Sequence, residues 1–273
     1  MSQFSSSFII IGERLNTHRE RFREAVVEQN ADLVRREVRR QVKAGATLLD
    51  VNASSVAARE TSDMLWILET ALAEIPIDVG LVIDSANPTC QAAALEHLNG
   101  RQGTVLNSNS ADTEKIGKTL ELAAKHQAGA MVTLANNAGI SGLTPNRVKR
   151  AEELRNAMLS AGIPEERQFL DPQVLPLAFD PQLPRAVLES VRELHSRWPG
   201  THIVAGLSNV SFNMPRRGLL NHVFLSMLVA NGIDSVICDP CRRALHETLC
   251  ATQALLGQDE FLATYLSAFA PED

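Results

Sequence analysis

The sequence predicts an α/β fold, a closed (β/α)8 TIM barrel that forms one domain over residues 1–273. Short apolar runs alternate with longer amphipathic segments along the whole chain, which is typical of strand–helix units. The runs are continuously apolar, as in a parallel sheet that is covered on both faces. A length of 273 residues is typical of one such barrel. A doubly wound open sheet is the alternative.

Each expected strand is followed by an expected helix, and no linker or low-complexity segment interrupts the series. Runs such as FIIIG and GLVIDS are rich in the β-branched residues that favour strands, and the segments between them have the apolar spacing of helices. The expected strands are 8–12, 47–52, 80–85, 104–108, 130–135, 168–172, 202–208 and 235–239. The expected helices are 31–44, 61–74, 88–98, 112–127, 145–161, 183–197, 218–231 and 242–256.

Proline and glycine mark the expected helix ends. A capping side chain precedes a proline of the first turn at Asn87-Pro88, Thr144-Pro145 and Asp239-Pro240. Glycines expected just past helix ends are Gly45, Gly129, Gly162 and Gly232. The segment 19–43 is rich in Arg and Glu and is interpreted as a solvated helix face.

Composition limits the class of protein. The chain is 45% hydrophobic but only 4% aromatic, so its core must be aliphatic. A net charge of −6 argues against nucleic acid as a partner. No apolar run approaches the ~18 residues of a membrane span, and the first residues lack the basic start of a signal peptide. The four cysteines form no regular framework, which indicates reduced thiols in a cytoplasmic protein.

Polar residues follow almost every expected strand, and a barrel brings these strand ends together on one rim. They are Glu13, Asn16, Asp50, Asn52, Asp84, Ser85, Asn107, Ser108, Asn136, Asp171, Ser208, Asn209 and Asp239. Each alone could be a turn former or a helix cap, and Asp239, directly before Pro240, is interpreted as a cap. Asp84 is not needed as one, because Asn87 can cap the next helix. The whole set indicates a binding site.

The rim residues limit the chemistry of that site. Amides and carboxylates with almost no Lys, Arg or His disfavour a phosphate ligand. No set of His or Cys suggests a metal, and Cys238 and Cys241 form a lone CxxC pair, interpreted as ordinary cytosolic cysteines with a redox pair as the alternative. Amides and carboxylates suit a flat, neutral heterocycle, because an Asp accepts two N–H bonds from an amino-pyrimidinone edge.

Six motifs of the chain resemble those of the methyltetrahydrofolate:corrinoid-protein methyltransferases. This family belongs to the pterin-binding barrels, with dihydropteroate synthase and the folate domain of cobalamin-dependent methionine synthase. The motifs are IIGERLN (10–16), LLDVNA (48–53), VIDSANP (82–88), VLNS (105–108), LDPQVLP (170–176) and GLSNVSFNMP (206–215). The stretch 219–240 is also similar, so the resemblance runs in order from about residue 8 to 257.

The resemblance implies a pterin in the barrel mouth, its edge bonded by Asp84, Asn107 and Asp171. It implies that Asn209 approaches the methylated ring nitrogen and that Gly206 and Ser208 line the site. We expect the remaining rim residues Glu13, Asn16, Asp50 and Ser85 to contribute to it.

The implied substrate is tetrahydrofolate or methyltetrahydrofolate. The implied partner is a corrinoid protein that carries cobalamin, and no metal of the chain's own is expected. A tertiary amine is a poor leaving group, so the ring nitrogen needs a proton or a strengthening hydrogen bond in the transition state. Asn209 and Asp171 are the expected catalytic residues. Arg216 and Arg217 could contact the corrinoid protein or the folate tail, or they could be solvated charges.

Barrels of this family are commonly homodimers, so the resemblance also implies a dimer. It leaves open the direction of transfer and the upstream methyl donor: an aryl methyl ether, as in O-demethylation, a methylamine or betaine, or acetyl-CoA synthesis. Dihydropteroate synthase is the nearest alternative enzyme, but its first-strand signature is absent, since GERLNTHRE stands there. A non-catalytic folate-binding protein is the alternative outside enzymes.

Overall fold

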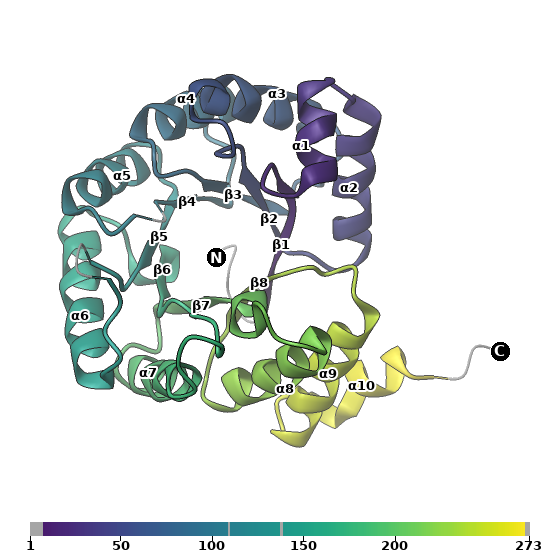
Figure 1. Ribbon diagram of the computed structural model, residues 1–273, viewed down its shortest axis with the longest axis vertical. Helices are drawn as coiled ribbons and strands as arrows, with labels where there is room; N and C mark the ends of the chain where they lie inside the picture. Colours follow the sequence, from purple (N-terminus) through teal and green to yellow (C-terminus); the bar gives the residue numbers. More distant parts are fainter. Residues whose placement is uncertain (1–7, 109, 137–138, 271–273) are drawn as a thin grey trace.

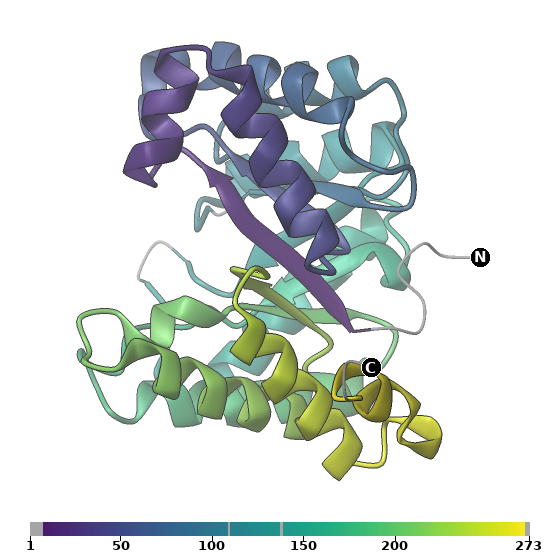
Figure 2. The same ribbon diagram turned by 90° about the vertical axis from the view of Figure 1, so that its right-hand side faces the viewer.

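The eight strands form a closed barrel in which each strand pairs in parallel with its neighbours in the sequence, and β1 pairs with β8 (Figure 1). This computed structural model describes residues 8–108, 110–136 and 139–270. The predicted (β/α)8 barrel is confirmed, and the open sheet is excluded. Figure 1 looks into the mouth, the face where the strands end; Figure 2, turned by 90°, shows β1 crossing the barrel with its carboxyl end on the opposite side from its start.

Seven of the eight strands lie close to their predicted ranges, and the first is longer than predicted. The strands are β1 Ile9–Asn16, β2 Leu48–Asn52, β3 Gly80–Asp84, β4 Thr104–Asn107, β5 Gly129–Thr133, β6 Gln168–Asp171, β7 His202–Gly206 and β8 Ser235–Cys238. The pairing of β1 with β2 shifts register between Gly12 and Leu15. The residues within this shift are Glu13 and Arg14.

Helices cover the outside of the barrel. They are α1 Glu20–Val27, α2 Ala31–Lys43, α3 Glu60–Leu72, α4 Pro88–Leu98, α5 Thr113–Lys125, α6 Thr144–Ser160, α7 Leu183–Arg197, α8 Arg217–Ala230, α9 Arg243–Leu255 and α10 Ala263–Ala268. The sequence did not predict α1 or α10. None of the helices in the described ranges has both the length and the apolar character that a membrane crossing requires.

The core has two parts, because successive side chains of each strand point to opposite faces of the sheet. One set of side chains fills the barrel: Ile9, Ile11, Leu48, Val82, Val105, Met131, Phe169 and Val204. The other set packs between the strands and the helices and includes Leu49, Leu81, Leu106 and Leu170. Both parts are largely aliphatic, as the composition predicts.

The helix punctuation is confirmed in part. Asn87 caps α4 by accepting a hydrogen bond from the Thr89 N–H, and Gly45, Gly162 and Gly232 take positive φ just past helix ends. Thr144 is not a cap, because its hydroxyl donates to Glu189 instead. Gly129 lies inside β5, not after a helix.

Candidate functional site

The polar residues at the mouth continue the rows of side chains that fill the barrel. Side chains two apart in a strand share a face, so Glu13 follows Ile11, Asp84 follows Val82, and Asp171 follows Phe169. By the same rule Asp50 follows Leu48 and Asn107 follows Val105. The apolar layers of the barrel therefore end in a layer of carboxyl and amide groups.

The carboxyl groups of this layer are strongly influenced by burial. Burial raises the pKa of Asp84 and that of Asp171 to about 6, from an ordinary value of 3.8. Burial, helped by the nearby charges of Asp84 and Glu13, also raises the pKa of Asp50 well above its ordinary value. The pKa of Glu13 is raised too, chiefly by burial. Four carboxyl groups that resist ionisation thus lie around one opening.

Two of these carboxyl groups keep an oxygen without a partner. Asp84 Oδ2 accepts a hydrogen bond of 2.7 Å from Asn52 Nδ2. Its Oδ1, and Oδ1 of Asp50, are buried and bond to nothing in the described part of the chain. Buried acceptors without partners are costly, so these oxygens are suited to N–H donors of a ligand.

Asn107 and Asp171 complete this side of the mouth. Asn107 is buried at the end of β4, directly beside Asp84 in the register. Asp171 lies at the end of β6, and its Oδ1 accepts a 2.7 Å bond from the Gln173 N–H. Below it, the fully buried Arg147 of α6 donates to the Pro172 carbonyl. The sequence analysis missed Arg147, because nothing in a helical segment marks an arginine as buried.

Two predicted residues have other hydrogen-bond partners. The Ser85 hydroxyl is buried and donates to Glu60 Oε1 at 2.6 Å, so it fixes a helix residue beside the mouth. Asn16 is half-buried at the end of β1, and its Oδ1 accepts from the His18 N–H. Both line the periphery of the carboxyl layer.

The turn after β7 presents Asn209. Residues Leu207–Ser211 form a short 3₁₀ helix, and the Asn209 side chain is exposed with no hydrogen bond to any described residue. Its Nδ2 lies only 2.9 Å from the point where a Cβ on Gly206 would be. Glycine at 206 therefore leaves room for the amide to fold back over the strand end. Arg217 holds the turn by donating to the Ser208 carbonyl at 2.9 Å and to Ser211 Oγ at 3.1 Å.

Asp239 is not the helix cap that the sequence predicted. The helix α9 begins later, at Arg243. Asp239 Oδ2 instead accepts a 2.8 Å bond from Arg14 Nη1, while Arg14 Nε donates to Glu37 at 2.6 Å. Glu37 lies in α2, so this part of the segment interpreted as a solvated face is in fact buried against β1. Arg14 of β1 therefore links α2 to the segment that follows β8, next to the pairing of β1 with β8 that closes the barrel.

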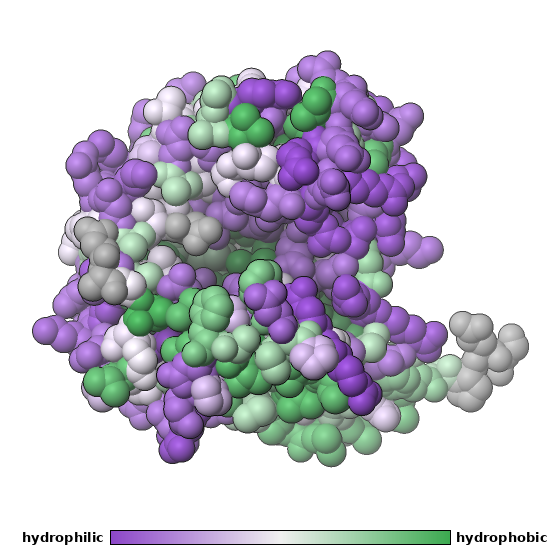
Figure 3. Space-filling model, in the orientation of Figure 1, coloured by the Kyte–Doolittle hydropathy of each residue, from purple (hydrophilic) through white to green (hydrophobic). Residues whose placement is uncertain are grey.

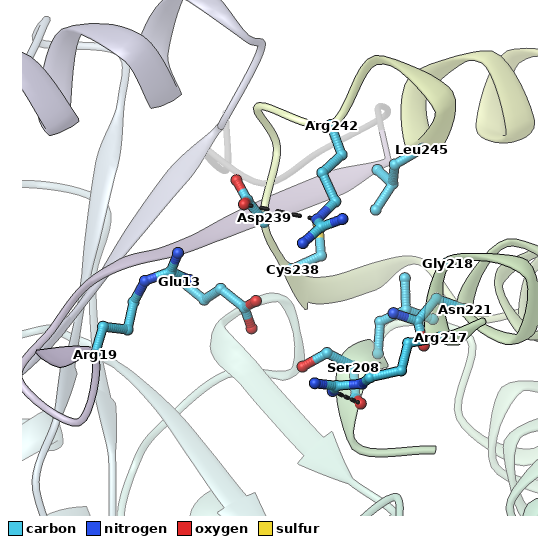
Figure 4. A pocket seen from close by; sticks show the side chains of 11 residues that line it. Glu13, Arg19, Ser208, Arg217, Gly218, Asn221, Cys238, Asp239, Arg242 and Leu245 are labelled. Atoms are coloured by element: carbon cyan, nitrogen blue, oxygen red, sulfur yellow. Dashed lines mark hydrogen bonds and ion pairs between the residues drawn. The ribbon is translucent and has the colours of Figure 1, made fainter. Parts of the chain in front are cut away.

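A pocket of about 270 Å³ opens between the ends of β1, β7 and β8 (Figure 4). Three arginines line it, Arg19, Arg217 and Arg242. The prediction of a rim almost without basic residues is therefore wrong. These arginines lie in loops and at a helix start, where strand-end patterns give no signal. A second cavity of about 230 Å³ lies beside Asn52 and Asp84.

The cysteines have no sign of redox activity. All four are free thiols, and burial raises the pKa of Cys238 and of Cys241 above the ordinary value. A thiolate is the reactive form, so a redox pair is disfavoured. Within the described ranges, no three His, Cys, Asp or Glu side chains gather in a way that could hold a metal ion.

Comparisons with known proteins agree on one family. The sequence profile of the pterin binding enzymes matches residues 12–239. The chain is 32% identical over 270 residues to a methylcorrinoid:tetrahydrofolate methyltransferase of Eubacterium limosum, covering 96% of each. It is 31% identical over 244 residues to methionine synthase of Mycobacterium leprae, which covers 85% of this chain but only 20% of that relative.

Solved structures show the same fold. A dihydropteroate synthase from Clostridium difficile, solved in the presence of pteroic acid, superimposes with a TM-score of 0.73 at 18% identity, over 93% of this chain and 99% of that one. From the profile match and the near full-length relative, the chain belongs to the family of pterin binding enzymes.

Proposed function

We propose that this protein is a methyltransferase that moves a methyl group between tetrahydrofolate and the cobalt of a corrinoid protein. The observation that carries the proposal is the near full-length similarity to a methylcorrinoid:tetrahydrofolate methyltransferase. It is joined by two buried oxygens of the mouth, Oδ1 of Asp50 and Oδ1 of Asp84, which have no hydrogen-bond partner among the described residues. Dihydropteroate synthases match in fold at 16–18% identity, which supports the barrel and not their reaction.

The carboxyl layer fits the pterin ring. An amino-pyrimidinone edge presents adjacent N–H donors, and Oδ1 of Asp84 is a buried acceptor without a partner in the part of the chain that the structure describes. We assign the edge to Asp84, Asn107 and Asp171, with Asp50 and Glu13 below and beside it. Asn16, Ser85, Gly206 and Ser208 line the periphery of the site. The folate itself then satisfies groups that are otherwise costly to bury.

Asn209 and Asp171 are the proposed catalytic residues. The corrinoid of the partner protein supplies the cobalt that gives or accepts the methyl group. Towards tetrahydrofolate, the lone pair of the ring nitrogen forms the new bond to carbon, the electron pair of the broken bond stays with the corrinoid, and the nitrogen loses a proton. The exposed Asn209 amide aligns that nitrogen. Water carries the released proton from the nitrogen to the Asp171 carboxylate, whose pKa is raised to about 6 in the free protein.

The proposal also includes the direction of methyl transfer, the contact with the corrinoid protein and the cellular location. The name of the Eubacterium limosum relative gives methylcorrinoid as donor, and we adopt that direction, with O-demethylation as one upstream source. Arg216, exposed at the start of α8, contacts the corrinoid protein. Four free cysteines support a cytoplasmic location.

Single-turnover transfer between methyltetrahydrofolate and a cob(I)alamin carrier tests the function, run beside a calorimetric binding titration on chelator-treated protein. Transfer in either direction together with binding of one folate per chain supports the enzyme. Binding without transfer would instead identify a non-catalytic folate-binding protein. Loss of binding after chelation would show that a metal belongs to the site.

Folate affinity should fall as the pH drops below about 6. Asp84 and Asp171 have pKa values of about 6 in the free protein, and accepting pterin N–H bonds requires their ionised forms. Binding therefore lowers both pKa values and releases protons near pH 6. Each group can weaken affinity by up to about tenfold per pH unit below that point, so the two together by up to about 100-fold. Calorimetry in two buffers of different ionisation enthalpy measures the released protons; a pH-independent affinity between 5 and 7 contradicts the assignment.

A homodimer is proposed through the apolar face of α8 and α10. Residues 218–230 of α8 contain no charge, and Leu219, Val223 and Met227 form an exposed stripe at a spacing of four. The nearby C-terminal segment exposes Phe261, Leu266 and Phe269. Figure 3 shows apolar surface gathered over this corner of the molecule. An uncharged helix of this kind is typically buried, and a second copy would bury it while leaving both mouths open.

The double variant Val223→Glu/Met227→Glu should be a monomer where the wild type is a dimer, because paired glutamates cannot be buried without partners. Light scattering at micromolar concentration measures the mass. Ile77→Glu, on another exposed apolar residue, is the matched control and should stay dimeric. A monomeric wild type contradicts the dimer.

A further inference from the structure

The pocket between β1, β7 and β8 differs in charge from the rest of the mouth. Figure 4 shows arginines from three separate elements around one space: Arg19 before α1, Arg217 at the start of α8, and Arg242 before α9. Glu13 points into the same space from β1. Each arginine comes from a different segment, two just before helices and one at a helix start, so no single helix end accounts for the gathering.

The arginines keep much of their hydrogen-bonding capacity. The Arg19 side chain lines the pocket and makes no hydrogen bond or ion pair with any residue in the described ranges. Arg242 Nε lies 3.8 Å from Asp239 Oδ2, which is too far for a hydrogen bond. The same oxygen accepts a 2.8 Å hydrogen bond from Arg14. Arg217 donates from Nε and one terminal nitrogen to the β7 turn, which leaves its other terminal nitrogen.

The acidic groups of the pocket do not cancel this charge. Asp239 is neutralised from below by Arg14, and Glu37, the other partner of Arg14, also pairs with Arg40. Glu13 then remains as one carboxyl group among three guanidinium groups. Guanidinium groups with free N–H donors bind carboxylates by charge-assisted hydrogen bonds.

The pocket adjoins the carboxyl layer, since Glu13 lines the pocket and its charge acts on Asp50. The mouth is therefore acidic on the side of β2, β3 and β6 and basic on the side of β1, β7 and β8. A ligand that complements both sides has N–H donors at one end, for the carboxyl layer, and anionic groups at the other end, for the arginines.

We propose that Arg19, Arg217 and Arg242 form a subsite for the glutamate carboxylates at the tail of the folate, and that the protein prefers polyglutamylated folate. This rests on the proposed function. It assigns Arg217 to the substrate tail, whereas Arg216, which does not line the pocket, faces the partner protein.

Binding of two tetrahydro ligands tests the subsite by calorimetry: tetrahydropteroate, which lacks glutamate, and tetrahydrofolate triglutamate. The test variant is Arg19→Gln/Arg242→Gln. The matched control is Arg21→Gln/Arg243→Gln, which removes the same charge from exposed neighbours that do not line the pocket. Arg217 is left in place, because it also holds the Asn209 turn.

We expect the wild type and the control to bind the triglutamate about tenfold or more tighter than the pteroate. In Arg19→Gln/Arg242→Gln this ratio should fall to about twofold or less, with pteroate affinity unchanged. Equal affinities of the wild type for the pteroate and the triglutamate overturn the subsite. They leave the proposed function standing, because the pterin ring still binds. An unchanged ratio with slower transfer to the corrinoid protein also overturns it and assigns the arginines to the partner. If neither ligand binds, the proposed function and the subsite fail together.

Discussion

Asn209→Ala should lower the rate of methyl transfer at saturating folate by roughly 10²–10³, the usual loss for one preorganised hydrogen-bonding group. Folate affinity should change little, because the pterin edge is held by other strands and the amide is assigned to the reacting nitrogen. Stability should also change little, since the Asn209 side chain makes no hydrogen bond within the described residues. Single-turnover transfer measured beside a binding titration separates these effects.

A second variant and its control test whether methyl transfer depends on the position of the Asn209 amide or only on its presence. Gly206→Ala keeps Asn209 but places a Cβ only 2.9 Å from where Nδ2 now lies, which is too close for contact. The displaced amide should slow transfer by about tenfold or more. Asn213→Gly, in the same loop at a residue with φ of 60° that suits glycine, is the control and should keep the wild-type rate. A normal saturated rate in Asn209→Ala removes Asn209 from the catalytic residues.

The barrel was predictable because the alternation of a short apolar run with a longer amphipathic segment repeats eight times along the chain. The two-residue periodicity of the strands places Glu13, Asp50, Asp84, Asn107 and Asp171 in one layer, since each stands two residues after a side chain of the barrel interior. The polar residues at the strand ends can thus be recognised from the local sequence of each strand.

The residues that were missed depend on contacts between distant segments. Asp239 precedes a proline as a cap would, yet it pairs with Arg14, 225 residues away. Arg19 and Arg242 lie in loops of unremarkable composition, and only closure of β1 on β8 brings them to one pocket. Ser85 stands at a strand end but turns to Glu60, because a serine after the last strand residue can face either side. Sequence patterns predict which residues form strands and helices. The positions of loop side chains depend on how distant strands come together in the closed barrel, which local patterns do not show.

Asp84→Asn should weaken folate binding by roughly 100-fold, about 2–3 kcal/mol, while making the free protein more stable. The new amide would place a donor against the pterin donors, although its oxygen can still accept from Asn52. The pKa of Asp84 is raised to about 6 in the folded protein, so the stability that its carboxyl group contributes is present below its unfolded pKa and is lost as the pH rises through 6.

At pH 7.5 the buried carboxylate therefore destabilises the free fold, and a neutral amide relieves that cost by on the order of 1 kcal/mol or more. Thermal unfolding without ligand and calorimetry with tetrahydrofolate measure the two effects. Asp63→Asn is the matched control, a buried aspartate in α3 that pairs with Arg59. It should keep full folate affinity and lose stability instead. Opposite signs in the two variants identify Asp84 as a binding group, because a purely structural carboxylate would lose stability on neutralisation; unchanged folate affinity in Asp84→Asn sinks the pterin assignment.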